Sequence, residues 1–343
     1  MKKKIMIHLL ALCSIISIFP NCSNAQDKIT TESYFGRWSL YLPGGAGWLE
    51  VHQEEGYLDA SLLWYGGSVV PVDNVYFDDD ALVVTQVSRV IRNRDEAGEA
   101  VRTHILTNIY QFSLVNQDEL KGTATFVRRN GSGVNKTEFT AKRIPDLPAK
   151  PDFTKIQYGK PIELFNGKDL SGWQLMEKER QNGFKAENGV LINDPVQKEG
   201  QPHISYGNLR TTDEFEDFNL KLEVNIPEGN NSGIYLRGIY EVQVLDSYGQ
   251  PLDSHNMGAI YSRITPTVAA EKPAGEWQAL DITLYKRYVT VVLNGTKIID
   301  CQPLLGVTGG AISADEFNRG PIYLQGDHGK VMYRNIVLTP VVE

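Results

Sequence analysis

Cysteine is nearly absent from this chain. Its 343 residues include three cysteines, and two of them, Cys13 and Cys22, fall in an apolar N-terminal segment. The third, Cys301, has no partner for an internal disulfide, so buried surface must stabilise the fold. The chain after the N-terminal segment is about 318 residues long, which is enough to build two domains with their own cores.

A basic surface is also missing. The chain has 34 Lys and Arg against 42 Asp and Glu, for a net charge of -8. A nucleic-acid partner is excluded, because a surface that follows phosphates needs clustered Lys and Arg. Metal motifs of recognisable spacing are absent as well, and no cofactor is evident. A divalent cation such as Ca²⁺ stays open, since loop oxygens can bind it without leaving a motif.

Long apolar runs are absent except at the N-terminus. There, Lys2–Lys4 precede the apolar stretch Ile5–Phe19, which is short for a membrane span, and Ser23–Ala25 supplies small residues. This pattern predicts a signal peptide over 1–25 and an exported protein, periplasmic or secreted. The alternative is a lipoprotein anchored through Cys22. No membrane span is expected in the rest of the chain.

Helical spacing of apolar residues is almost absent. Short runs of alternating polarity, bounded by Gly, Asn, Asp and Pro, recur instead and are typical of an all-β protein. Eight successive strands with short turns predict a small antiparallel β-barrel or curled sheet in the first half. These strands are expected at 36–41, 47–53, 57–64, 67–77, 81–92, 103–115, 119–128 and 135–143.

Three prolines between Ile144 and Pro151 mark a domain boundary, because each removes a backbone donor from any strand. We expect a β-domain over 27–144, a linker over 145–151 and a second domain over 152–343. Asn294–Gly295 predicts a hairpin, since both residues tolerate positive φ. Strands of the second domain are expected at 219–226, 233–237, 240–246, 278–286, 288–293, 298–301 and 322–325.

The segment from Glu228 to Asp246 is the most informative. Its alternation predicts two strands joined around Gly238, with Ile234 and Val242 on the apolar face. The polar face offers a cation, a carboxylate, an amide and an aromatic hydroxyl, which are groups that bind a sugar. The same alternation of polar and apolar residues over 218–226 places another carboxylate, that of Glu223, on a polar face. The polar side chains expected to lie together are Tyr235, Arg237, Glu241, Gln243 and Glu223.

Further motifs surround this segment. They are Leu164–Trp173, Glu276–Trp277, Leu324–Gly329 and Tyr333–Ile336. In this order, and together with the strands around Gly238, they resemble the bacterial 3-keto-disaccharide hydrolase family over roughly residues 161–341. The resemblance implies a concanavalin-like β-sandwich, or jelly roll. It also implies an enzyme of carbohydrate catabolism that cleaves glycosides already oxidised at C3, with sugar-oxidising enzymes as partners.

A ketone at C3 acidifies the hydrogen on C2. Removal of this proton can expel the group on C1, after which water adds to the enone. The reaction needs a general base, a group that stabilises the enolate oxygen and an acid for the departing oxygen. Glu241 is the first candidate base and Glu223 a further one, and Arg237 is the candidate enolate stabiliser. The alternative for Glu241 is a structural ion pair with Arg237.

His328 is the fourth catalytic candidate. It lies in a turn within one of the resembling motifs, and loops at strand ends commonly carry functional residues. Asp327 could orient it or only shape the turn. His255 could bind substrate or be a surface residue, and Trp277 could be a sugar platform or part of the core. The candidate substrate-binding residues are Tyr235, Gln243, Asp246, His255, Trp277 and Gln325.

Two other functions stay open. Some concanavalin-like glucanases carry Glu-x-Asp-x-x-Glu on a strand, and this chain has Glu241 to Asp246 at that spacing. Gln243 replaces the central acid, and strict alternation puts Asp246 on the opposite face, so a conventional glycoside hydrolase is the weaker alternative. A non-catalytic carbohydrate-binding module is the other, because a polar groove alone suffices for binding.

Overall fold

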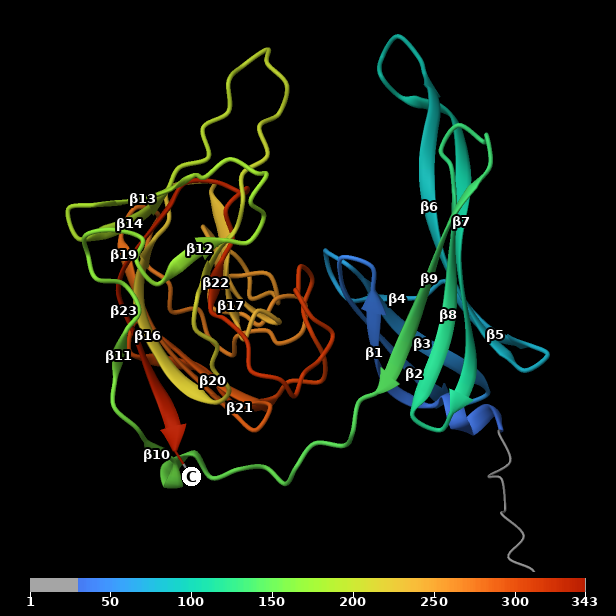
Figure 1. Ribbon diagram of the computed structural model, residues 1–343. Helices are drawn as coiled ribbons and strands as arrows, with labels where there is room; N and C mark the ends of the chain where they lie inside the picture. The colour runs from blue at the N-terminus through green and yellow to red at the C-terminus, as the bar shows by residue number, and fades with distance from the viewer. Residues whose placement is uncertain (1–29, 343) are drawn as a thin grey trace, which may run out of the picture.

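The structure is a computed structural model in which residues 30–342 are described, so the predicted signal peptide and Cys22 lie outside the described residues. Nearly all of its regular elements are strands, which confirms the all-β prediction (Figure 1). Two short 3-10 helices, η1 (Thr31–Tyr34) and η2 (Phe153–Lys155), complete them. Within residues 30–342 no helix is long and apolar enough to cross a membrane.

The first half forms one nine-stranded antiparallel sheet in the order β4-β3-β2-β1-β9-β8-β7-β6-β5. Neighbours in the sheet are mostly neighbours in sequence, as short turns predict. Hairpin β6–β7 extends well beyond the rest of the sheet (Figure 1). The strands are β1 (Gly36–Leu42), β2 (Gly45–Glu54), β3 (Tyr57–Trp64), β4 (Val70–Pro71), β5 (Asn74–Asp78), β6 (Ala81–Arg94), β7 (Ala100–Asn116), β8 (Glu119–Val127) and β9 (Val134–Arg143).

The two edges of this sheet are joined by one extended segment, residues 70–78. The amide of Val72 donates to Ala60 O of β3 at 3.1 Å, and the amide of the next residue, Asp73, donates to Thr85 O of β6 at 2.9 Å. The segment thus passes from one edge strand to the other and curls the sheet into a barrel. We call residues 31–143 the barrel. Closing the edges also removes unpaired strand edges on which other chains could pair.

Aromatic side chains fill the barrel. Trp64 of β3 contacts the rings of Tyr110, Phe126 and Phe139 across the interior, with centroids 5.1 to 5.6 Å apart. Tilted and edge-on contacts of this kind are favourable for aromatic rings. Trp64 therefore packs against the barrel core.

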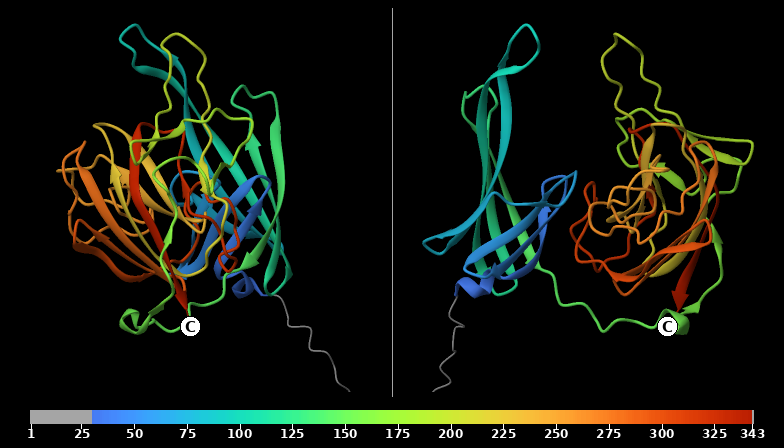
Figure 2. Two further views of the ribbon diagram at one scale, coloured as in Figure 1. Left: turned by 60° about the vertical axis from the view of Figure 1, so that its left-hand side comes forward. Right: turned by 180° about the vertical axis from the view of Figure 1, so that it is seen from behind.

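The second half is a two-sheet sandwich (Figure 2), as the predicted jelly roll requires. The larger sheet runs β13-β14-β23-β16-β19-β20-β21, with β10 and β11 also paired to β23, and the smaller runs β12-β15-β22-β17-β18. The strands are β10 (Gln157–Tyr158), β11 (Ile162–Glu163), β12 (Trp173–Leu175), β13 (Phe184–Glu187), β14 (Val190–Asn193), β15 (Leu209–Thr211), β16 (Phe218–Asn225), β17 (Asn231–Leu236), β18 (Tyr240–Leu245), β19 (Trp277–Tyr285), β20 (Tyr288–Leu293), β21 (Thr296–Pro303), β22 (Tyr323–Leu324) and β23 (Val331–Val342).

Because side chains alternate across each strand, the apolar side chains of both sheets face one another and form the sandwich core. Ile234 of β17 and Val242 of β18 are fully buried there, as is Leu220 of β16 in the facing sheet. The predicted hairpin at Asn294 and Gly295 is confirmed: both have positive φ, +51° and +82°, and they join β20 to β21. The opposite face of β17 and β18 is left for polar side chains.

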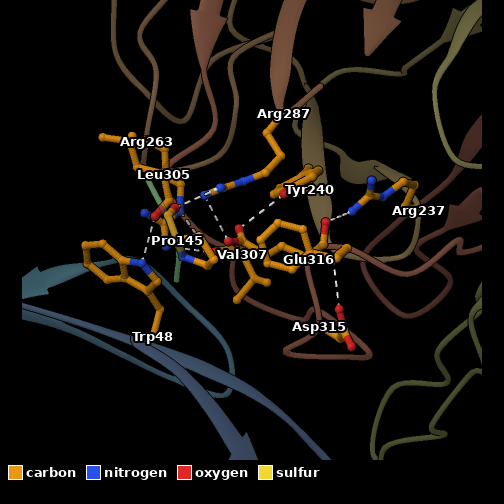
Figure 3. Close-up of polar contacts among 11 residues, drawn as sticks. Trp48, Pro145, Arg237, Tyr240, Arg263, Arg287, Leu305, Val307, Asp315 and Glu316 are labelled. Atoms are coloured by element: carbon orange, nitrogen blue, oxygen red, sulfur yellow. Dashed lines mark hydrogen bonds and ion pairs between the residues drawn. The ribbon is translucent and has the colours of Figure 1, made fainter. Parts of the chain in front are cut away.

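The barrel and the sandwich touch beyond the linker. Trp48 of β2 donates its indole N–H to Leu305 O at 2.8 Å, and the Arg263 guanidinium lies 4.4 Å from its ring centroid (Figure 3). Arg287 donates to Pro145 O in the linker at 3.1 Å. Trp48 is buried within the sandwich's apolar cluster. That each half folds alone, with the boundary at 145–151, stays a prediction.

Candidate functional site

A pocket of about 200 Å³ lies on the outer face of the smaller sheet. Its floor comes from β17 and β18, and loops from four other parts of the chain surround it. Pockets between structural units are common ligand sites. The lining residues are Gly66, Gly67, Asn231, Tyr235, Glu241, Gln243, Tyr261, Gly309, Gly310, Gln325 and His328.

The pairing of β17 with β18 sets the floor. Tyr235 lies opposite Glu241, and Gly233 lies opposite Gln243. The predicted shared face of Tyr235, Glu241 and Gln243 is confirmed. Gly233 is required for this arrangement, because a Cβ there would collide with the Glu241 carboxylate. The carboxylate therefore lies over the bare backbone of the neighbouring strand, deep in the pocket.

Glu241 is an almost completely buried carboxyl, 3% exposed. Burial raises its pKa to about 8, although the hydrogen bond from Tyr235 acts in the opposite direction. The Tyr235 hydroxyl lies 2.7 Å from Glu241 Oε2 and 2.7 Å from Gly309 O. Its single proton can bond one of these two oxygens at a time. A neutral Glu241, donating to Tyr235 while Tyr235 donates to Gly309, satisfies both short contacts.

Tyr235 is itself fixed by stacking. Its ring lies on that of Tyr323 of β22, with centroids 3.8 Å apart and an interplanar angle of 14°. The Tyr323 hydroxyl donates to Gly310 O at 2.8 Å. Burial raises the pKa of both tyrosines well above the ordinary value. Both hydroxyls consequently stay protonated near neutral pH and act as hydrogen-bond donors.

His328 lies at the rim of the pocket, in the turn between β22 and β23. Its ring is exposed on one side, yet the protein packed around it lowers its pKa below the ordinary value, with the charge of Asp327 opposing this change. Asp327 is held by His203, whose Nε2 lies 3.3 Å from Asp327 Oδ2. His328 is therefore mainly neutral at pH 7, where an imidazole can accept a proton.

Two amides complete the polar floor. Gln325 donates from Nε2 to the Tyr235 hydroxyl at 3.1 Å, and Gln243 lies on the strand beside Glu241. The side-chain oxygens of both glutamines are buried without a hydrogen-bond partner among the described residues. A buried unpartnered oxygen is costly, so these atoms favour a ligand that donates hydrogen bonds. The hydroxyls of a sugar have this property.

Arg237 does not share this face, contrary to the sequence prediction. Strand β17 ends at Leu236, and Arg237 and Gly238 both adopt positive φ, +53° and +69°, as hairpin turns require. The turn sends the Arg237 side chain to the Glu316 carbonyl, beside the Tyr240 ring (Figure 3). The alternative of an ion pair between Arg237 and Glu241 is wrong for the same reason.

Glu223 and Trp277 are likewise misplaced by the sequence prediction, because both belong to the larger sheet. Glu223 of β16 accepts from Arg334 Nε at 2.9 Å, and the Arg334 guanidinium stacks 4.0 Å from the Trp277 ring centroid. This pairing lowers the Glu223 pKa. The alternation of polar and apolar residues correctly predicted that Glu223 lies on a polar face, but that face belongs to the larger sheet. Neither residue lines the pocket.

Asp246 and His255 lie near the pocket without lining it. Asp246 Oδ2 accepts from the amide of Gly229 at 2.9 Å, which shapes the turn before β17. The His255 ring stacks edge-on against Tyr261, a lining residue, with centroids 4.8 Å apart. Asp246 is thus a turn residue in this structure, whereas His255 supports the pocket wall.

Several lining residues were missed at the level of sequence. Asn231 lies in the segment singled out by sequence but was not chosen as a site residue, and Tyr261 and the paired glycines at 309–310 and 66–67 were not considered for the site. Adjacent glycines are a weak signal for close backbone approach. Within residues 30–342, no group of three His, Cys, Asp or Glu side chains is placed to hold a metal ion. A bound divalent cation stays a prediction.

Comparison with known proteins places this geometry in a family. Residues 160–339 match the model of the 3-keto-alpha-glucoside-1,2-lyase-like domain, just over half of the chain. The chain belongs to this family. The recognised resemblance is thereby confirmed, and the matched region holds the sandwich strands that form the pocket floor.

Individual proteins are similar to parts of this chain. A 3-keto-disaccharide hydrolase of Bacteroides thetaiotaomicron is 28% identical over 167 residues, which are 40% of this chain and 57% of the relative, so the match spans little more than half of that protein. A Parabacteroides distasonis crystal structure with a provisional glycosyl hydrolase name is 30% identical, with a TM-score of 0.43, covering 57% of this chain and 93% of that one. A second such structure from the same organism is 22% identical, with a TM-score of 0.42, and the match covers 53% of this chain and 94% of that one.

Proposed function

We propose that this member of the 3-keto-alpha-glucoside-1,2-lyase-like family cleaves 3-keto-glycosides by elimination followed by hydration. The observation that carries the proposal is the opposite perturbation of two groups in one pocket. Burial deep in the pocket holds Glu241 as a neutral acid, and the protein packed around His328 at the rim favours its neutral form. Two titratable groups driven apart in this way are typical of an acid and base pair in catalysis.

The base in this mechanism is His328. Its unprotonated ring nitrogen removes the C2 proton, which the C3 ketone has acidified, and the electron pair moves onto the ketone oxygen. An amide N–H from Gln243 or Gln325 stabilises that enolate oxygen, and the buried setting strengthens the contact. This role replaces the one first expected for Arg237, which lies outside the pocket.

The acid is Glu241. Its carboxyl proton passes to the glycosidic oxygen as the C1–O bond breaks, which leaves a C1–C2 double bond conjugated with the ketone. The Tyr235 hydroxyl stabilises the resulting carboxylate by donating to it. Water then adds its oxygen at C1 and a proton at C2, giving a free 3-keto sugar and returning both groups to their starting forms. No oxidant or reductant is consumed.

The composition of the pocket favours this route over the alternatives. A conventional glycoside hydrolase uses two carboxyls on either side of the bond, about 5 to 10 Å apart. Among the lining residues Glu241 is the single carboxyl, and Asp246 is engaged in a turn. A binding module needs the polar groups but has no use for a buried acid with a strongly raised pKa.

The deciding experiment incubates the purified protein with a 3-keto-glucoside and, separately, with the unoxidised parent, and follows aglycone release. Release from the keto form alone supports the proposal, release from the parent indicates a conventional glycosidase, and binding without release indicates a module. Deuterium at C2 should slow the chemical step or be lost to solvent. We further propose an exported enzyme, anchored through Cys22 if lipidated, that receives its substrate from a sugar-oxidising enzyme.

A further inference from the structure

The pocket wall opposite the sandwich strands comes from the barrel. Gly66 and Gly67 follow β3 in the barrel, yet they line the same pocket as Glu241. These residues lie outside the region matched by the family model, residues 160–339. We call residues 65–68 the barrel loop.

Direct hydrogen bonds fix the barrel loop on the sandwich. The amide of Gly310 donates to Tyr65 O at 3.0 Å, on one side of the pocket. On the other side, the Ser68 hydroxyl lies 2.8 Å from His255 Nε2, and the amide of Val69 donates to Ser262 Oγ at 2.8 Å. The loop is therefore attached at both ends, with its two glycines between the attachments.

The Ser68 contact is oriented by a third residue. Asp253 Oδ1 lies 2.6 Å from His255 Nδ1, so Nδ1–H points to this carboxylate and Nε2 faces the Ser68 hydroxyl. The same ring stacks on Tyr261, which lines the pocket. One histidine thereby couples the barrel loop to the pocket wall.

Glycines make this close approach feasible. A Cβ on Gly309 would collide with the backbone of Gly67, so the two loops pack main chain against main chain. A Cβ on Gly66, in contrast, would meet nothing within 4 Å, because this residue faces the open pocket. Gly66 and Gly67 accordingly line the pocket with main chain rather than with side chains, and peptide groups hydrogen-bond well to hydroxyls.

We propose that the barrel loop is a substrate-binding wall of the pocket, which contacts sugar hydroxyls through the backbone of Gly66 and Gly67. Ser68 and His255 act as positioning residues for it. This inference rests on the proposed function for the identity of the ligand, a 3-keto-glycoside. It makes the barrel part of the enzyme's specificity, while the acid and base remain on the sandwich.

The test fills the space in front of the loop. Gly66→Trp should fold, because the new side chain enters open space, but should block the pocket and raise KM at least tenfold. Ser88→Trp, at an exposed position of β6 that does not line the pocket, is the matched control and should stay within about twofold of the wild type. Ser68→Ala should raise KM about three- to tenfold, the scale of one neutral hydrogen bond, with kcat changed less. Ser68→Thr keeps the hydroxyl, so its KM should stay close to that of the wild type. Ser88→Ala, at an exposed position of β6, should leave KM unchanged.

A second readout separates this inference from the proposed chemistry. Titration calorimetry with methyl β-D-glucoside, which has no C3 ketone and cannot eliminate, measures sugar binding alone. Weaker binding by Gly66→Trp and Ser68→Ala supports the inference even if the wild type releases no aglycone from a keto substrate. Unchanged KM and unchanged binding in folded Gly66→Trp protein would overturn it, as would the absence of any sugar binding by the wild type.

Discussion

The pH dependence of turnover should identify Glu241 as the proton donor. Its pKa of about 8 makes it roughly 90% protonated at pH 7 and roughly 10% at pH 9. If the neutral acid is the active form, kcat/KM on a 3-keto-glucoside should fall about tenfold between these values. Below neutral pH the rate should fall again as His328 becomes protonated. The profile should therefore be a bell with its maximum near neutral pH.

The variant that tests this assignment is Glu241→Gln, which keeps the shape and neutrality of the protonated side chain but has no acidic proton. Its rate should fall by about a hundredfold or more, and the alkaline limb should disappear. The assay is initial-rate aglycone release from pH 5 to pH 10, with circular dichroism at each pH to verify folding. A folded variant with the wild-type alkaline limb would refute the reasoning, because another group would then be titrating.

The same pKa predicts an effect on stability. Raising the pKa of Glu241 from 4.5 to about 8 corresponds, at about 1.4 kcal/mol per pH unit, to about 5 kcal/mol. The sign follows from burial: the fold accepts the neutral acid, so this stability is fully present below pH 4.5 and is lost as the pH rises to 8. Urea unfolding should show the wild type losing several kcal/mol relative to Glu241→Gln over this range. Parallel curves for the two proteins would contradict the raised pKa.

Three further substitutions probe the pocket. His328→Asn should lower kcat by about a hundredfold and abolish the acidic limb of the pH–rate profile, and survival of that limb would exclude His328 as the base. Tyr235→Phe removes a hydrogen bond that lowers the Glu241 pKa, so the alkaline limb should move to higher pH, and a move to lower pH would contradict the assigned contact. Gly233→Ala should displace the Glu241 carboxylate and cost at least tenfold in rate, and a wild-type rate in the folded variant would argue against the observed register.

Local patterns in the sequence predicted much of the fold. Strands β2 and β3, and the hairpin at Asn294, follow from alternation bounded by turn residues, and both signals lie within a few neighbouring positions. Closure of the barrel could not be predicted in this way. It depends on Val72 and Asp73 bonding to two different strands, and nothing in the residues themselves distinguishes this from a continuous edge strand.

The positions of site residues were predicted correctly within one hairpin, that of β17 and β18, and wrongly where residues of two different sheets were assigned to one face. Tyr235, Glu241 and Gln243 share a face because their strands pair directly. Glu223 has equally good alternation, but alternation does not say to which sheet a strand belongs. Arg237 failed for a smaller reason: the turn began one residue early, and a positive φ redirected its side chain.

The assignment of acid and base roles needed three-dimensional information. On the strand pattern alone, Glu241 is a carboxylate among polar neighbours, and the natural choice for it is the base. Glu241 shares its pocket with Tyr235, with the loop at Gly309 and with the barrel loop, which are far apart in the sequence, and its burial in the folded protein is what raises its pKa. His328 sits at the more open rim and stays neutral. Glu241, the first candidate base on the sequence, is thus proposed as the acid, and His328 takes the role of base. Because the barrel loop lines the same pocket as Glu241, a change confined to this loop should alter the alkaline limb as well as substrate binding.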